Sequence, residues 1–166
     1  MDEFIENFDV GGLPDDWRSL TELSIRLHNK LTIPDTLTER EALFSNLLRD
    51  ADKVDIFRVI AEIPYKDRSS FKDAEQRDCA RDEIMQCVLE HRCVPRTFER
   101  SKFESTISQC CMGFELVYQK SKELTRVQGY LAKMIANARE AATEKESAQL
   151  NILENELHKS FNANVS

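Results

Sequence analysis

The sequence predicts an all-α protein in which a short N-terminal helical bundle is followed by a long C-terminal coiled-coil helix. Glycine and proline, four of each in 166 residues, are few for this length. Charged residues make up 32% and hydrophobic residues 41% of the chain, a balance typical of amphipathic helices around a real core. The last third, residues 97–162, contains no proline and has apolar residues at alternating gaps of three and four, the spacing of a coiled-coil seam.

These patterns divide the chain into an acidic flexible tail at 1–14, a helical head at 15–94 and the long helix at 97–162. Residues 1–17 hold six acidic residues and no basic residue, interleaved with two phenylalanines. Such a segment is either a frayed terminus or an acidic, aromatic peptide that becomes ordered in the groove of a partner.

Start and stop signals predict three helices in the head. The first runs over 15–31, with Trp17 on its buried side. The second runs over 38–63 and opens with the capping box Thr38-Glu39-Arg40-Glu41, in which a hydroxyl and a carboxylate satisfy free backbone N–H groups. The third runs over 70–92. Each is followed by a proline, which pushes the preceding residue away from helical angles; these are Pro34, Pro64 and Pro95.

The long helix has one apolar seam, and a second register also fits after Leu124, as expected if the helix touches more than one neighbour. Gly113 and Gly129 lie inside it, each at a cost of roughly 1 kcal/mol relative to alanine. Whether the helix runs unbroken through them stays open. The seam comprises Phe103, Ile107, Cys110, Phe114, Val117, Leu124, Leu131, Ile135 and Ala138.

The end of the chain carries a fresh apolar stripe on a helix that has little else to pack against. An exposed stripe of this kind marks a partner surface, and the alternative is an intramolecular return onto the head. We expect the partner-binding residues to be Phe114, Val117, Leu124, Leu131, Ile135, Leu150, Leu153, Leu157 and Phe161.

No motif for catalysis, cofactor binding or a metal site is expected. The chain has no glycine-rich phosphate loop, nucleophile elbow, His-Glu-x-x-His or paired Cys-x-x-Cys. The sequence has three side chains of types that bind zinc close together, Cys87, His91 and Cys93, but a fourth ligand at a standard spacing is missing. We therefore interpret Cys87 as a core residue and His91 as a buried, satisfied histidine.

Charge and hydropathy limit the partners further. A net charge of −7 argues against wrapping nucleic acid, and no apolar run approaches the roughly 20 residues that cross a bilayer. Five cysteines without a repeated spacing fit reducing surroundings. We expect a non-enzymatic intracellular protein that binds neither nucleic acid directly nor membrane.

In size, acidity and layout, with a long helix carrying Phe114, Val117, Leu124, Leu131 and Ile135, the sequence resembles the small subunit of the augmin complex. The resemblance implies a structural subunit of a mitotic spindle assembly that pairs with other coiled-coil subunits. It also implies indirect action on microtubules and the γ-tubulin ring complex, which would place the chain in the cytoplasm, on the cytoskeleton and at the mitotic spindle. The alternatives are a kinetochore linker subunit and a helical adaptor of signalling or transcription machinery.

Overall fold

The computed structural model describes residues 14–30, 32–68, 78–96 and 100–163, and these contain helices but no β-strand. The all-α prediction is thereby confirmed. The chain forms two compact units that divide between Asp52 and Lys53, within one helix. The expected tail at 1–14 lies outside the described residues except for Pro14. No helix in the described part is long and apolar enough to span a membrane.

Unit 1 contains α2 (Asp15–Leu27) and the first part of α3 (Glu39–Glu62). The predicted capping box opens α3. The Thr38 backbone N–H donates to Glu41 Oε2 at 2.8 Å, and the Glu41 N–H donates to Thr38 Oγ1 at 3.3 Å. These bonds confirm the predicted start of α3, and α2 begins at Asp15 as predicted. Only the ends of the two helices differ from the prediction, by a few residues.

Trp17 lies at the edge of unit 1, so the expectation that it is a core residue is wrong. Its side chain is exposed and packs edge-on against Phe44, with the ring centroids 5.7 Å apart. The Arg40 guanidinium lies 4.7 Å above the indole ring and also pairs with Asp16 at 3.1 Å. The indole thus joins α2 to α3 by aromatic and cation–π contacts rather than by full burial.

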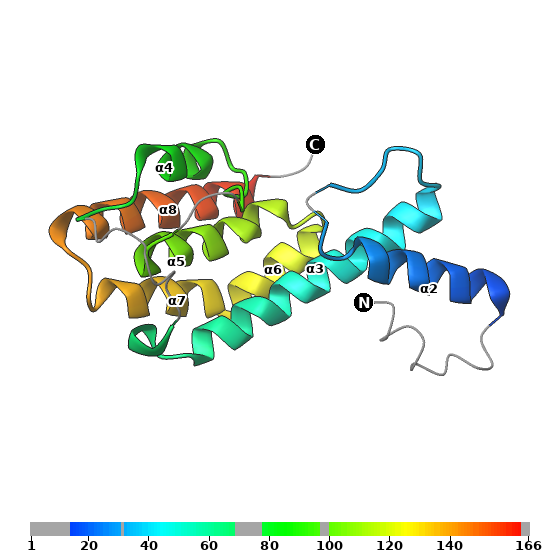
Figure 1. Cartoon of the computed structure of the whole chain (residues 1–166), viewed down its shortest axis with the longest axis horizontal. Helices are drawn as coiled ribbons and strands as arrows, with labels where there is room; N and C mark the ends of the chain where they lie inside the picture. Colours follow the sequence, from blue (N-terminus) through cyan, green and yellow to red (C-terminus); the bar gives the residue numbers. More distant parts are fainter. Residues whose placement is uncertain (1–13, 31, 69–77, 97–99, 164–166) are drawn as a thin grey trace. The chain divides into compact units, whose positions relative to one another are not determined.

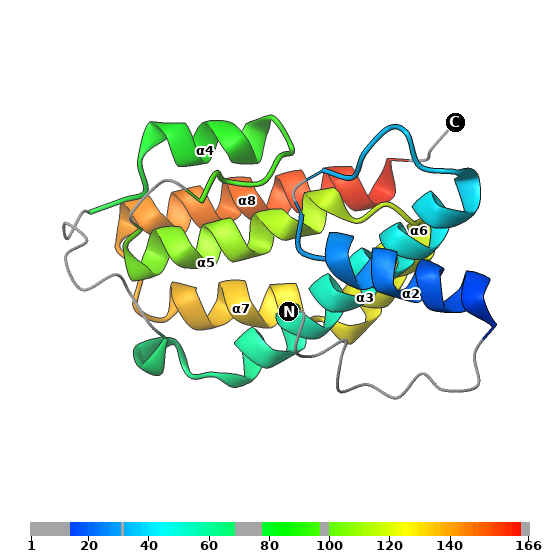
Figure 2. The ribbon, with the colours of Figure 1, turned by 45° about the vertical axis from the view of Figure 1, so that its right-hand side comes forward.

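Unit 2 contains the end of α3 and all later elements. Its main bundle is formed by α4 (Asp82–Leu89), α5 (Lys102–Cys111), α7 (Tyr130–Arg139) and α8 (Glu144–Asn162), which both views of the ribbon draw close together (Figures 1 and 2). Helix α4 contacts α5 and α8, and α5, α7 and α8 contact one another. Helix α6 (Gln119–Gln128) contacts α7 and α8. Two short 3-10 helices, η1 (Tyr65–Asp67) and η2 (Met112–Glu115), contact α7 and α8 respectively. The large apolar side chains that are fully buried in the core include Phe57, Ile84, Val88, Ile107, Met134, Leu150 and Leu153.

The expected single helix over 97–162 is not what forms: α5, η2, α6, α7 and α8 replace it, and the longest of these has 19 residues. Local signals explain the breaks. Ser101 and Thr143 each form an N-terminal capping box, which starts a new helix at that point. Gly129 has φ 70° and is both the C-cap of α6 and the N-cap of α7. The apolar periodicity therefore continues along the sequence while the helix axis changes direction.

Replacing Gly129 with alanine is expected to lower the free energy of unfolding by about 1 kcal/mol, because a Cβ is disfavoured at a left-handed angle. Among the described residues, no atom beyond Gly129, its two chain neighbours and the local helix backbone lies within 4 Å of the position that a Cβ at Gly129 would occupy. The loss therefore comes from backbone strain and not from a clash. Urea denaturation followed by circular dichroism measures it. Asparagine, which tolerates this conformation better, is the matched control, and an equal loss in both variants would contradict this explanation.

The start of α4 is fixed by a buried carboxylate. Glu104 on α5 is only 2% exposed and accepts from Arg81 Nε at 2.9 Å and from Arg81 Nη2 at 3.1 Å. It also accepts from the backbone N–H groups of Arg81 and Ser101, both at 3.1 Å. Gln149 on α8 holds the adjacent residue, Ala80, by bonding to both its N–H and its carbonyl oxygen, at 2.8 and 2.9 Å.

The end of α4 is a Schellman motif with histidine in the position that glycine usually occupies. His91 has φ 52°, its N–H donates to the Val88 carbonyl, and the Arg92 N–H donates to the Cys87 carbonyl. The His91 ring stacks on Phe114 at 4.8 Å between centroids, and Nε2 lies 2.8 Å from Glu156. These side-chain contacts offset the strain of the left-handed backbone. They also correct the expectation for His91, which is exposed and not buried.

Candidate partner-binding surface

The nine residues expected to bind partners do not form one surface in this structure. Phe114 is partly buried against the core of unit 2, whereas Val117 and Leu124 are exposed. The other six are buried in the core of unit 2: Leu131, Ile135, Leu150, Leu153, Leu157 and Phe161.

The C-terminal stripe belongs to α8, which packs against α4, α5 and α7. Leu150 and Leu153 are completely buried there. The C-terminal stripe therefore packs within the same chain, which was the alternative to a partner surface. The physical reason is the turn between α7 and α8, which brings the stripe back over the preceding helices instead of extending it into solvent.

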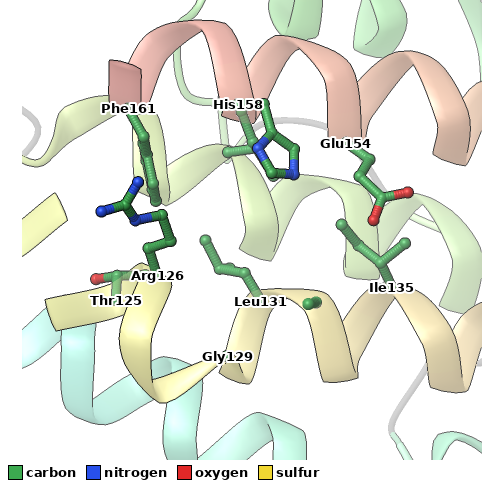
Figure 3. Close-up of a pocket in the computed structure, with 10 residues that line it drawn as sticks. Thr125, Arg126, Gly129, Leu131, Ile135, Glu154, His158 and Phe161 are labelled. Atoms are coloured by element: carbon green, nitrogen blue, oxygen red, sulfur yellow. The ribbon is translucent and has the colours of Figure 1, made fainter. Parts of the chain in front are cut away.

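Four of the nine residues nevertheless meet at a pocket between α6, α7 and α8. Its volume is about 150 Å³. Figure 3 shows Leu131 at its centre, Phe161 beside Arg126 at one end, and Ile135 below Glu154 at the other. The complete lining is Thr125, Arg126, Gly129, Leu131, Ala132, Ile135, Glu154, Leu157, His158 and Phe161.

Gly113 on η2 supports the floor of this pocket. A Cβ at Gly113 would lie 3.2 Å from a methyl carbon of Leu157, and 3.3 Å from side-chain atoms of Leu131 and of Phe161. Because glycine has no side chain, these three can pack directly over the η2 backbone. Side chains that line the pocket thus approach the Gly113 backbone closely.

The rim of the pocket has an uneven distribution of charge. At one end Glu154 is paired with Arg139, whose Nη2 lies 3.2 Å away. At the other end Arg126 is exposed, and His158, which lies between the two ends in Figure 3, is exposed as well. Arg126 has no carboxylate partner among the described residues, and neither has Lys122 one turn earlier on α6. The end of the pocket formed by Arg126 is therefore basic.

Helix α6 also has an exposed apolar side. Leu124 is 45% and Val127 80% exposed. They are three residues apart, so they are neighbours on the helix surface. Val117, which precedes α6, is exposed as well. This apolar pair lies on α6 but does not line the pocket.

A more open depression lies between α4 and α8, with Leu89 and Ile152 as its exposed apolar residues. Its other lining residues are polar: Asn155, Glu156, His158, Lys159 and Asn162. It has no apolar floor comparable to that of the pocket beneath Arg126.

The cysteine side chains are consistent with structural roles. Cys87 is buried in the core of unit 2, as expected. Burial also raises the pKa of Cys110 to about 12, so this thiol is protonated at neutral pH and is not a nucleophile there. Among the residues that the structure describes, no cluster of three or more His, Cys, Asp or Glu side chains has the geometry of a metal site.

Sequence reasoning missed the polar part of the pocket, above all Arg126, Glu154 and His158. A usable signal was present for Arg126, because residues 119–139 contain five basic residues and one acidic residue in a chain of net charge −7. Comparisons with known proteins add no relative: no protein-family model, no curated protein and no solved structure matches this chain.

Proposed function

We propose that this protein is a non-enzymatic structural subunit of a multi-protein helical assembly and that it pairs with another subunit through α6. The exposed pair Leu124 and Val127 is the observation that carries the proposal. Two large apolar side chains in water at helical spacing form a seam that a second helix can cover, with a gain of roughly 25 cal/mol per Å² of apolar surface buried.

The mitotic spindle is the proposed setting, and the augmin complex is the proposed assembly. Support comes from the resemblance in size and acidity to the small augmin subunit and from the all-helical fold. The long helix that was part of the resemblance is replaced by α5 to α8 in the structure. In this role the chain would act on microtubules and the γ-tubulin ring complex only through its neighbouring subunits, and promote nucleation of microtubules at existing spindle microtubules.

The test is affinity purification of the tagged full chain from dividing cells, with mass spectrometry of the proteins that accompany it. The variant carries both Leu124→Asp and Val127→Asp. Gln128→Asp is the control, because it adds an acid at an exposed position of α6 without removing an apolar side chain. A truncation at Pro95 would remove α5 to α8 from the core of unit 2, so point variants are the sharper test.

Spindle-assembly subunits should accompany the wild-type chain and the control in near-equal amounts, and the double variant should lose them while it keeps its helical circular dichroism spectrum. Recovery of kinetochore proteins in their place would favour a linker subunit, and recovery of signalling or transcription proteins would favour an adaptor. Unchanged partners with the double variant would refute pairing through α6.

A further inference from the structure

The pocket between α6, α7 and α8 combines an apolar interior with a basic end, and this combination identifies a class of ligand. The interior is formed by Leu131, Ile135, Leu157 and Phe161. A cavity of ~150 Å³ with apolar walls is large enough to hold a benzene ring. The pocket volume of about 150 Å³ therefore suits one phenylalanine or leucine side chain.

The charge around the pocket decides what kind of segment can present that side chain. Lys122 and Arg126 are four residues apart on α6, so they share one side of the helix. Lys133, which directly follows the lining residue Ala132, is exposed and has no carboxylate partner among the described residues. Glu154, the one carboxylate in the lining, is already paired with Arg139. An acidic segment would therefore meet unpaired cations, whereas a basic one would meet like charge.

We infer that this pocket is a docking site for an acidic amphipathic helix of another protein, which inserts one phenylalanine or leucine between α7 and α8 and places carboxylates beside Arg126 and Lys122. The apolar anchor provides most of the affinity, and the charges provide selectivity and speed of association. The site is separate from the Leu124 and Val127 pair. It rests on the proposed function only in that the helix would belong to a neighbouring subunit.

The test uses the purified full chain and two synthetic helical peptides with the same single phenylalanine anchor. One carries glutamate and the other lysine at every flanking charged position, and fluorescence polarisation measures their binding. The glutamate peptide should bind about tenfold or more tightly than the lysine peptide, and added salt should reduce this difference because it screens exposed charges.

Two variants separate the anchor from the charges. Ala132→Trp should fill the pocket and abolish binding of both peptides, whereas Ala136→Trp, one turn later on α7 and also exposed, should leave binding unchanged. Arg126→Glu should lose or reverse the charge preference, while Lys145→Glu, with the same change in charge at an exposed position of α8, should not.

Equal binding of the two peptides, or no binding of either by a folded chain, would overturn the inference. So would a homodimer in sedimentation velocity that Ala132→Trp dissociates, because a second copy would then be the occupant. Selective binding of the glutamate peptide by a chain that recovers no assembly subunits from cells would support this site while refuting the proposed function.

Discussion

Replacing Glu104 with alanine is expected to lower the free energy of unfolding by about 3 kcal/mol, as for other broken buried ion pairs. The carboxylate accepts two side-chain and one backbone hydrogen bond from Arg81, and one from the Ser101 N–H. All four donors would lose their acceptor at once. We place the loss at the low end of the range for buried pairs because the Arg81 side chain is 24% exposed and can regain some hydration. Urea denaturation followed by circular dichroism measures it.

Glu123→Ala is the matched control, since it removes a carboxylate from the exposed Lys120–Glu123 pair at 3.3 Å. Pairs of this kind contribute about 0–1 kcal/mol. A loss in Glu104→Ala no larger than that in the control would show that the carboxylate does not organise the start of α4.

The same carboxylate should make stability depend on pH. Burial by itself raises the pKa of Glu104, but the hydrogen bonds from Arg81 and from the backbone N–H groups of Ser101 and Arg81 outweigh it, so the pKa lies below the ordinary value of 4.5. A carboxylate with a lowered pKa in the folded state binds protons more weakly than in the unfolded chain. Its contribution to stability is therefore complete above pH 4.5. That contribution is lost as the pH falls through the lowered pKa that Glu104 has in the folded state.

Glu104→Gln tests this dependence, because glutamine keeps the size of the side chain and removes its charge. The difference in unfolding free energy between wild type and Glu104→Gln should be largest near neutral pH and should shrink as the pH falls below 4.5. A difference that stays constant across this range would mean that the charge of Glu104 contributes nothing.

Local signals in the sequence were sufficient for the first two helices of the head and insufficient for its third helix and for the C-terminal half. The third helix is predicted over 70–92, but residues 69–77 lie outside the described residues and α4 begins only at Asp82. The Thr38 capping box and the prolines that follow the helices act over a few residues, so they placed α2 and α3 correctly. The same kind of signal was present at Ser101 and Thr143. The prediction of one long helix rests on apolar periodicity and not on these capping boxes. The same periodicity occurs in one long helix and in several shorter helices packed together.

The pocket could be predicted only in part for a related reason. Four of the residues expected to bind partners do lie close together, but they line a pocket within one chain. They are Leu131, Ile135, Leu157 and Phe161. Their meeting depends on the angle at Gly129 and on the turn before α8, which set the directions of three helices. Those directions follow from long-range packing, and the spacing of residues along one helix does not contain them.

Leu153→Ala is expected to lower the free energy of unfolding of the isolated chain by about 2–5 kcal/mol, because a completely buried leucine leaves a cavity when it is truncated. Leu124→Ala, at a side chain that is 45% exposed, should change it by no more than about 0.5 kcal/mol. Urea denaturation of each purified variant measures its contribution to the stability of the chain. Co-purification of partners from cells then measures its contribution to partner binding.

The two measurements should give opposite patterns. If Leu153 is a core residue and Leu124 a partner contact, the first variant loses stability as an isolated chain and the second loses partners while it stays stable. If Leu153 instead faced a partner, its truncation would leave the isolated chain as stable as wild type, because the side chain would be in water before binding. Such a result would favour the long, open helix over the packed arrangement of α5 to α8.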